Sequence, residues 1–389
     1  MELIENTWKK SDQGADVSWL SPAEAERVME FHRQVPGYQP TPLRSLPELA
    51  AECGVKSLLV KDESARFGLN AFKGLGGIYA VARAAGRLLG IVPDRIAFSE
   101  LRKPEYREAL RHLTFATATD GNHGKGVAWA AGLLGCPAKV FMPKGSSPRR
   151  AQAIQNAGRA EVTITPWNYD DTVNYVSQRA AKDGWVLVQD TSWQGYEQVP
   201  RWIMQGYTTM AQEAAEQTTE IPTHIFLQAG VGAMAGAVTG YFRSRYGEKC
   251  PKIVLVEPDG AACIYESMEV GDGQPHTARG NGETIMAGLN CGSPCTVAWE
   301  ILRDYGSYAL HCGDDAARLG MRTLGRYGIV SGESGASGVG AFLELIKDPM
   351  LKEKLGIGPD SGILFFSTEG NTDPESYEKI MAGADCAEG

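Results

Sequence analysis

The stretch HIFLQAGVGAMAG, residues 224–236, joins an apolar run typical of a buried strand to a glycine turn and the start of a helix. A strand that leads directly into a helix is the repeating unit of parallel sheets. Gly230 and Gly232 leave the backbone N–H groups of the turn accessible to a phosphate, although close helix packing is an alternative explanation of these glycines. The stretch therefore predicts an α/β sheet with a ligand site at a strand end.

The same rhythm recurs along most of the chain. Short β-rich runs alternate with amphipathic stretches of helical length, each of which ends in glycine. The predicted strands are residues 114–119, 138–143, 161–165, 185–190, 224–230, 252–258 and 362–370, and the predicted helices between them are 124–135, 149–158, 170–184 and 232–247. We therefore predict the α/β class, with mainly parallel sheets covered by helices.

Length, charge and histidine pattern restrict the function. A chain of 389 residues is long enough for two domains of roughly 100–200 residues each. Its formal net charge of −9 argues against nucleic acid or an anionic membrane as a partner, so small molecules are expected. The start MELIENTWKK lacks the apolar core of a signal peptide, which predicts a cytoplasmic protein. The histidines form no HxxxH or HExxH pattern, so we expect no catalytic metal.

Lys73 stands in NAFKGLGG, residues 70–77, between Phe72 and a glycine-rich helix start. Most lysines are solvated surface charges, which is the alternative interpretation here. An apolar pocket and the positive end of a helix would both lower the pKa of Lys73, which suits an amine that forms a Schiff base.

Asp120 lies in TATDGNHGKG, residues 117–126, in a turn that opens a helix. A turn of this kind usually receives an anion, so a carboxylate there needs an explanation. One explanation is an N-cap, for which aspartate is a preferred residue. A second candidate acid, Asp190, ends the run WVLVQD, where aspartates also commonly begin turns.

Glu257 supports a rival interpretation of the glycine turn. It ends the next predicted strand 257 − 232 = 25 residues after Gly232, near the spacing of the acid that holds the ribose of a dinucleotide. A nicotinamide-dependent oxidoreductase is therefore an alternative. In FFSTEGNTD, residues 365–373, Ser367 and Thr368 leave another buried strand and either satisfy backbone groups or face a heteroaromatic ring.

Together these segments resemble the fold-type II enzymes that use pyridoxal 5′-phosphate, a clan that includes the tryptophan synthase β chain and the serine and threonine dehydratases. The resemblance extends from about residue 40 to 373, in matching order and spacing. Its motifs are PTPL (40–43), VKDES (60–64), NAFKGLGG, DGNHGKG, the mid-chain glycine turn, SGESGASG (331–338) and STEGN (367–371).

The resemblance implies roles for particular residues. Lys73 matches the lysine that forms the internal aldimine, and Asn122 the asparagine that hydrogen-bonds the phenolic oxygen of the cofactor. Thr368 matches the hydroxyl residue that faces the pyridine nitrogen, where a neutral group gives a weaker electron sink that suits β-elimination. The phosphate loop corresponds to Gly230, Val231, Gly232 and Ala233.

Several motifs differ from those of the dehydratases and point to one family within the clan. AFK (71–73), TDGNH (119–123), AGVG (229–232) and VQDTSWQGYEQVP (188–200) are similar to the diaminopropionate ammonia-lyase family, which splits 2,3-diaminopropionate into pyruvate and two ammonia molecules. An aspartate in the turn would attract the second ammonium of such a substrate, with its own charge favoured by the helix start. The resemblance implies Asp120 as the Cα base for the D isomer and Asp190 for the L isomer. The implied substrate contacts are Thr119, Asp120, Gly121 and His123, with His123 packed beneath the cofactor.

The resulting hypothesis is a two-domain lyase with a tryptophan synthase β-like fold. Residues 1–91 plus 190–389 are predicted to form a large domain that binds the cofactor, and residues 92–189 a small inserted domain, with pyridoxal phosphate in the cleft between them. The family also implies a homodimer. A serine or threonine dehydratase, the nicotinamide-dependent oxidoreductase and a non-catalytic carrier of the cofactor remain alternatives. Glu333 is predicted either near the cofactor ring or in a turn-capping role.

Overall fold

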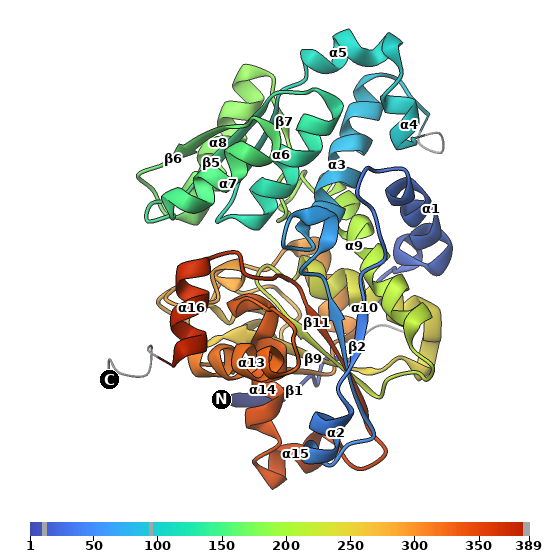
Figure 1. The fold of residues 1–389 in the computed structure, drawn as a ribbon, viewed down its shortest axis with the longest axis vertical. Coiled ribbons are helices and arrows are strands. Elements are labelled where there is room, and N and C mark those ends of the chain that lie inside the picture. The colour runs from blue at the N-terminus through green and yellow to red at the C-terminus, as the bar shows by residue number, and fades with distance from the viewer. Residues whose placement is uncertain (10–13, 93–95, 384–389) are drawn as a thin grey trace. The chain divides into compact units, whose positions relative to one another are not determined.

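The computed structural model describes residues 1–9, 14–92 and 96–383, which form two compact units (Figure 1). The first unit falls within Met1–Pro22, Pro40–Ala65 and Met210–Gly389, and the second within Ala23–Gln39 and Arg66–Thr209. Within the described part of the chain, no helix is both long and apolar enough to cross a membrane.

A seven-stranded sheet in the order β1-β10-β9-β8-β11-β3-β2 forms the centre of the first unit. The five inner strands run parallel, and β1 and β2 pair antiparallel at the two edges. The bounds are β1 (Glu2–Glu5), β2 (Leu43–Ser45), β3 (Ser57–Asp62), β8 (His224–Gln228), β9 (Lys252–Pro258), β10 (Tyr308–Cys312) and β11 (Gly362–Ser367). Because β3, β8 and β11 are parallel neighbours, their carboxyl ends lie at one edge of the sheet.

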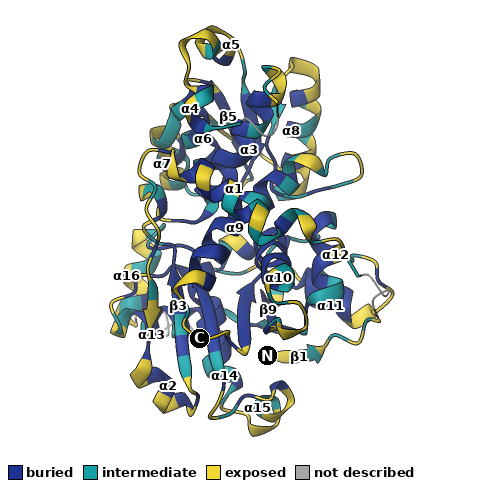
Figure 2. Cartoon of the chain, turned by 90° about the vertical axis from the view of Figure 1, so that its right-hand side faces the viewer, coloured by how far each residue is buried: buried dark blue, intermediate teal, exposed yellow. Residues whose placement is uncertain are grey.

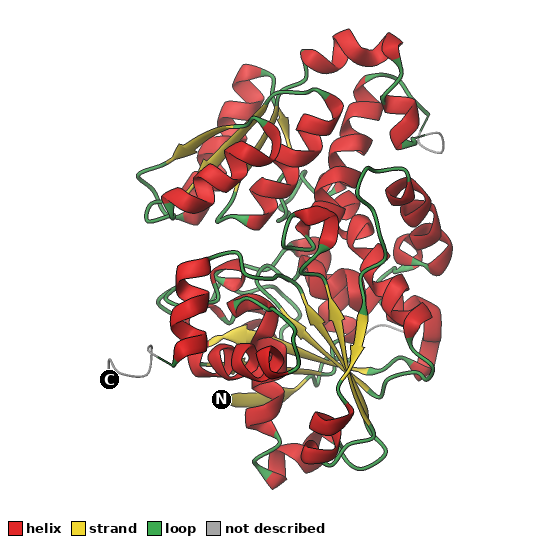
Figure 3. Cartoon of the chain, viewed as in Figure 1, coloured by secondary structure: helices red, strands yellow, loops and turns green. Residues whose placement is uncertain are grey.

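Helices cover both sides of this sheet (Figure 3). One face packs Phe226, Val254 and Phe365 against Phe342 of α14, in a core that is almost entirely buried (Figure 2). The alternate strand residues, such as Ile225 and Leu255, point to the other face and are equally buried. The helices are α2 (Pro47–Cys53), α10 (Ala233–Tyr246), α11 (Cys263–Val270), α12 (Thr296–Tyr305), α13 (Asp314–Arg326), α14 (Glu333–Leu345), α15 (Pro349–Leu355) and α16 (Pro374–Ala382).

The second unit has a four-stranded parallel sheet in the order β6-β5-β4-β7. Its strands are β4 (Phe115–Ala118), β5 (Ala138–Met142), β6 (Glu161–Ile164) and β7 (Val186–Leu187). Its helices are α1 (Pro22–Arg33), α3 (Lys73–Leu88), α4 (Phe98–Leu101), α5 (Arg107–Arg111), α6 (Asn122–Leu134), α7 (Pro148–Gly158) and α8 (Tyr169–Asp183), and α9 (Gln198–Gln217) continues from this unit into the first.

Glycines let α3 and α6 cross at backbone contact. A Cβ built on Gly77 would lie 2.9 Å from the carbonyl carbon of Gly126, and one on Gly126 would lie 3.0 Å from the Lys73 carbonyl oxygen. Any side chain at either position would therefore force the helices apart. This contact fixes the start of α3, and with it Lys73, beside the turn that opens α6.

The predicted α/β class and the predicted helices and strands are present, with differences at their ends. The antiparallel edge strands and β10 have no counterpart in the sequence-based prediction. The helix predicted over 149–158 does end at Gly158, but the residue that takes the left-handed C-cap conformation is Arg159 (φ 57°) and not the glycine. Gly158 remains helical and packs against α6, where a Cβ would lie only 1.7 Å from the Ala128 carbonyl oxygen.

The predicted inserted domain, residues 92–189, contains the four-stranded sheet. The compact unit around this sheet is larger, since it also includes α3 and most of α1. The domain boundaries drawn from the sequence stay a prediction.

A buried ion pair joins two of the sequence motifs in the first unit. Lys61, in VKDES, is fully buried, and its Nζ donates to Glu213 Oε2 (2.7 Å) and to the Thr41 carbonyl (2.6 Å). Thr41, in PTPL, donates its hydroxyl to Glu63 Oε1 at 2.5 Å. A buried charge is tolerated only when it is paired and hydrogen-bonded, so this network explains the polar residues of both motifs.

Replacing Lys61 by alanine is expected to lower the free energy of unfolding by about 3–5 kcal/mol, because Glu213 would keep a buried charge without its cation. Lys56→Ala is the control, since Lys56 pairs with Glu220 on the surface and its loss should cost less than about 1 kcal/mol. Urea denaturation followed by circular dichroism measures both. Equal losses in the two variants would contradict a role for the buried pair.

Candidate active site

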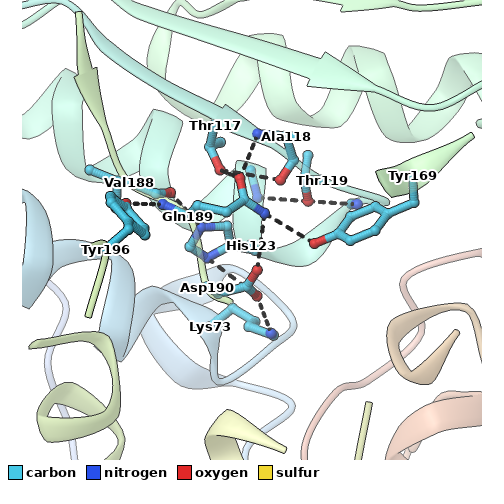
Figure 4. Close-up of polar contacts among 12 residues, drawn as sticks. Lys73, Thr117, Ala118, Thr119, His123, Tyr169, Val188, Gln189, Asp190 and Tyr196 are labelled. Atoms are coloured by element: carbon cyan, nitrogen blue, oxygen red, sulfur yellow. Dashed lines mark hydrogen bonds and ion pairs between the residues drawn. The ribbon is translucent and has the colours of Figure 1, made fainter. Parts of the chain in front are cut away.

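Lys73 is the first residue of α3, and its ammonium contacts a carboxylate. Nζ donates to Asp190 Oδ2 at 2.7 Å, with the Lys73 side chain 18% exposed and that of Asp190 9% exposed (Figure 4). The rings of Phe72 and Tyr207 lie 5.5 and 6.0 Å from Nζ. The second unit thus holds a largely buried amine between two aromatic rings and one carboxylate.

The ion pair sets the protonation of both partners. Burial disfavours the Lys73 ammonium, but the Asp190 carboxylate more than compensates and raises the pKa of Lys73. Burial likewise opposes the charge on Asp190, but the neighbouring His123 and the Lys73 ammonium together lower the pKa of Asp190 to about 2. The prediction of a lowered pKa for Lys73 is therefore wrong for this arrangement, because the sequence did not place Asp190 beside it.

The N-cap residue of α6 is Gly121, and the side chain that serves the turn before it is that of Thr119 rather than Asp120. The Thr119 hydroxyl oxygen accepts from the backbone N–H groups of Gly121 and Gly124, both at 3.0 Å. The N-cap interpretation of Asp120 is therefore wrong. Burial raises the pKa of Asp120, against the opposing effect of Lys73. The expectation that the helix start favours the charged form of Asp120 is therefore wrong, because desolvation has the larger effect. The substrate contacts proposed for Thr119 and Gly121 stay a prediction, and the Thr119 hydroxyl already serves the turn.

His123 lies next to Asp190 in the same unit. It is 2% exposed, and Nε2 contacts the Val188 carbonyl oxygen at 2.8 Å. Burial lowers the pKa of His123, so the ring is neutral and Nε2, which faces an acceptor, carries its hydrogen. Nδ1 is then an acceptor: it lies 3.7 Å from Asp190 Oδ2, with no hydrogen-bond partner in the described part of the chain. The predicted contact of His123 with substrate stays a prediction.

In the first unit, the glycine turn after β8 forms a cradle of small residues. It consists of Gly230, Val231 and Gly232, and Ala233 then begins the 14-residue helix α10. Gly232 has a φ of 89°, and a Cβ on Gly230 would lie 3.2 Å from Cys291 Sγ. A backbone cradle at the start of a long helix suits a phosphate group.

Thr368 follows β11 in the same unit and is oriented by the end of β8. Gln228 Nε2 donates to the Thr368 hydroxyl oxygen at 3.0 Å and to the Phe366 carbonyl at 2.8 Å. Since this hydroxyl oxygen accepts a hydrogen bond, its own hydrogen is available to an acceptor such as an unprotonated pyridine nitrogen. The cradle and the hydroxyl therefore both fit pyridoxal phosphate.

Glu257 and Glu333 have structural roles in the first unit. The Glu257 carboxylate is fully buried and accepts from the backbone N–H groups of Ile264 (2.8 Å) and Tyr265 (2.6 Å), at the start of α11. Burial raises the pKa of Glu257 to about 8. The interpretation of Glu257 as a ribose-binding acid is wrong, because the carboxylate is used within its own unit. Glu333 accepts from the Ser376 hydroxyl at 2.5 Å, which connects α14 to α16.

Sequence reasoning missed the polar groups around Asp190. Gln189, Tyr169 and Tyr196 form hydrogen bonds at the end of β7 (Figure 4). The position of Gln189, next to Asp190 at a strand end, could have indicated that it belongs to the site. The tyrosines lie outside the strand, so nothing in the local sequence connects them with Asp190.

The lowered pKa of Asp190 predicts how stability depends on pH in the cofactor-free protein. A carboxyl whose pKa falls on folding, here from 3.8 to about 2, stabilises the fold above its unfolded pKa. This contribution is lost as the pH falls toward the folded pKa. We expect the unfolding temperature of the wild type to exceed that of Asp190→Asn at about pH 6, and the difference to shrink between about pH 4 and 2.

Calorimetry at each pH makes this measurement. Asp183→Asn is the control, because Asp183 pairs with Arg179 near the surface and its charge should matter less. A difference between wild type and Asp190→Asn that stays constant with pH would contradict the ion pair.

Comparison with known proteins agrees with this geometry. Residues 35–365 match the family described as "Pyridoxal-phosphate dependent enzyme". The chain is 47% identical to the diaminopropionate ammonia-lyase of Salmonella typhimurium over 386 residues, which are 96% of this chain and 95% of that relative.

Two crystal structures of diaminopropionate ammonia lyase from Escherichia coli are similar over nearly the whole chain. One, in complex with an aminoacrylate-PLP azomethine reaction intermediate, has a TM-score of 0.89 and 44% identity, and covers 98% of this chain and 97% of that chain. The other, in complex with D-serine, has a TM-score of 0.91 and 44% identity, and covers 99% and 98%. The chain therefore belongs to the family of pyridoxal-phosphate dependent enzymes, with the fold-type II architecture.

Proposed function

We propose that this chain is a lyase that converts D- and L-2,3-diaminopropionate into pyruvate and two ammonia molecules. The observation that carries the proposal is the gathering of two acidic groups around one amine: Asp190 contacts Lys73, and Asp120 interacts with it electrostatically. Asp120 is not used to cap its helix, so its carboxylate is available for chemistry. The relatives named diaminopropionate ammonia-lyase support this choice of substrate.

The residues that the resemblance assigns to the cofactor would hold it. Lys73 would bind it covalently, and Asn122 would hydrogen-bond its phenolic oxygen. Thr368 would donate to the pyridine nitrogen. The phosphate would lie at Gly230, Val231, Gly232 and Ala233. When bound, pyridoxal phosphate supplies an electron sink for the pair of electrons left at Cα.

The protein's own contribution is the movement of protons. A general base works best when its pKa lies near the working pH, and the Lys73 ammonium holds the pKa of Asp190 far below that range. Once Lys73 gives up its charge, Asp190 loses one of the groups that oppose the effect of burial, so its pKa rises. The base is therefore activated when the lysine is engaged. Asp120, with a pKa already raised by burial, is suited to the same task.

The reaction balances with one water molecule. The aspartate takes the Cα proton, the Cβ–N bond breaks, and the β-amine leaves as ammonia. Water then replaces the remaining nitrogen, which gives pyruvate and the second ammonia. A dehydratase acting on serine is the alternative within the same fold. We also propose a homodimer, as the family resemblance implies.

Replacing Lys73 by alanine is expected to remove the visible absorbance of the bound cofactor and to abolish pyruvate formation, because no amine would hold the cofactor. In the wild type, two ammonia molecules per pyruvate are expected from diaminopropionate, with lower rates on serine. Spectra and product assays in one cuvette measure both. Lys103→Ala, at a surface pair with Glu100, is the control. A wild type faster on serine would favour the dehydratase.

Substitutions of the two aspartates are expected to lower the rate on different isomers of the substrate. Asp120→Asn should lower kcat on the D isomer, and Asp190→Asn kcat on the L isomer, each about 10²–10⁴-fold as for loss of a general base. Pyruvate assays on the pure isomers make the measurement. Equal loss on both isomers in either variant would count against the division of roles.

A further inference from the structure

The chain leaves the sheet abruptly before Asp190. Val188 N–H still donates to the Ala116 carbonyl at 2.8 Å, as expected for the parallel pair of β7 and β4. The backbone groups that follow on the two strands bind side chains instead of each other. The Val188 carbonyl contacts His123, and the Ala118 N–H donates to Gln189 Oε1 at 2.9 Å. The Gln189 side chain thus accepts the hydrogen bond that a continued strand would have accepted from Ala118. The main chain can therefore leave the sheet here and turn Asp190 toward Lys73.

The hydrogen bonds also fix which way the Gln189 amide points. The Ala118 N–H is only a donor, so the amide oxygen must face it, and the Thr117 hydroxyl donates to the same oxygen at 3.1 Å. Nε2 therefore points the other way, toward the Tyr169 hydroxyl oxygen (3.0 Å) and Asp190 Oδ1 (3.5 Å). Gln189 is fully buried, so water is a poor substitute for these partners.

The Asp190 carboxylate is consequently held through both oxygens. Oδ2 accepts from Lys73, and Oδ1 faces the amide N–H that Gln189 directs between Asp190 and Tyr169 (Figure 4). When Lys73 is engaged elsewhere, the Gln189 amide N–H still faces this carboxylate. Tyr169, at the start of α8, fixes that amide from outside the strand.

We propose that Gln189 and Tyr169 are positioning residues for Asp190, and that they set the rate on the L isomer relative to the D isomer. The proposal rests on the proposed function, in which Asp190 serves the L isomer. Misplacing a base by about 1 Å can cost 10²-fold in rate, so one hydroxyl that fixes the amide has a measurable effect. Asp120 does not depend on Tyr169, because Thr119 shapes its turn.

Tyr169→Phe is the sharpest test, because Gln189 also contacts Thr117 and Ala118 on the strand that leads to Asp120. In the holoenzyme, kcat on the L isomer should fall about tenfold, as for one lost hydrogen bond to a positioned group, and kcat on the D isomer should change less than about twofold. The acid limb of the L profile should move to higher pH, since the charged form of Asp190 is held less well.

Tyr175→Phe is the matched control. Tyr175 lies on the same helix, and its hydroxyl accepts from Arg179 at 3.2 Å. Asp190→Asn is the reference for the isomer effect. If Tyr169→Phe folds poorly, Gln189→Glu replaces it: a carboxylate beside Asp190 should move the acid limb of the L profile further toward high pH. A crystal structure of cofactor-free Tyr169→Phe should show the distance from Asp190 Oδ2 to Lys73 Nζ lengthened from 2.7 Å.

The outcomes separate the two proposals. If Asp190→Asn is selective for the L isomer but Tyr169→Phe matches Tyr175→Phe in rate and pH profile, the positioning role is wrong and the proposed function stands. If Asp190→Asn lowers both isomers equally, the division of bases is wrong and the positioning proposal falls with it.

Discussion

The crossing of α3 and α6 at Gly77 and Gly126 is the constraint on which the second unit depends. No side chain fits at either position, and the contact reaches back to the carbonyl of Lys73. The glycines of NAFKGLGG and DGNHGKG therefore serve packing as much as any anion. Without this close approach, the amine at the start of α3 and the acidic turn before α6 would not share one environment.

The Lys73–Asp190 pair is a resting arrangement in which each group suppresses the other. The ammonium is a poor nucleophile and the carboxylate a poor base while they are paired. In the proposed function, covalent attachment of the lysine would relieve the aspartate and so would be linked to proton abstraction. Gln189 and Tyr169, in the positioning proposal, would keep the carboxylate in place through that change.

Local patterns predicted much of this molecule. The strands β4 to β9 and β11 and the helices α6, α7, α8 and α10 could be predicted because a buried strand, a glycine turn and an amphipathic helix are visible within a few residues. The edge strands β1 and β2 are short and pair over long sequence separations, which no local pattern records. The pKa of Lys73 was predicted with the wrong sign, because its partner lies 117 residues away. The role of Glu257 was predicted wrongly for a different reason: its partners, two backbone N–H groups of α11, lie only 7 and 8 residues away, but no spacing pattern identifies them.

The role of Thr119 at the start of α6 has a consequence for how such a site diversifies. Two adjacent residues have different roles in this turn. The Thr119 hydroxyl accepts the hydrogen bonds from the helix start, so the side chain of residue 120 is not needed for them. A substitution at position 120 would therefore change the charge of the turn, and in the proposed function the charge facing the substrate, while the helix that follows keeps its beginning. A turn built in this way lets substrate preference drift without a corresponding loss of foldability.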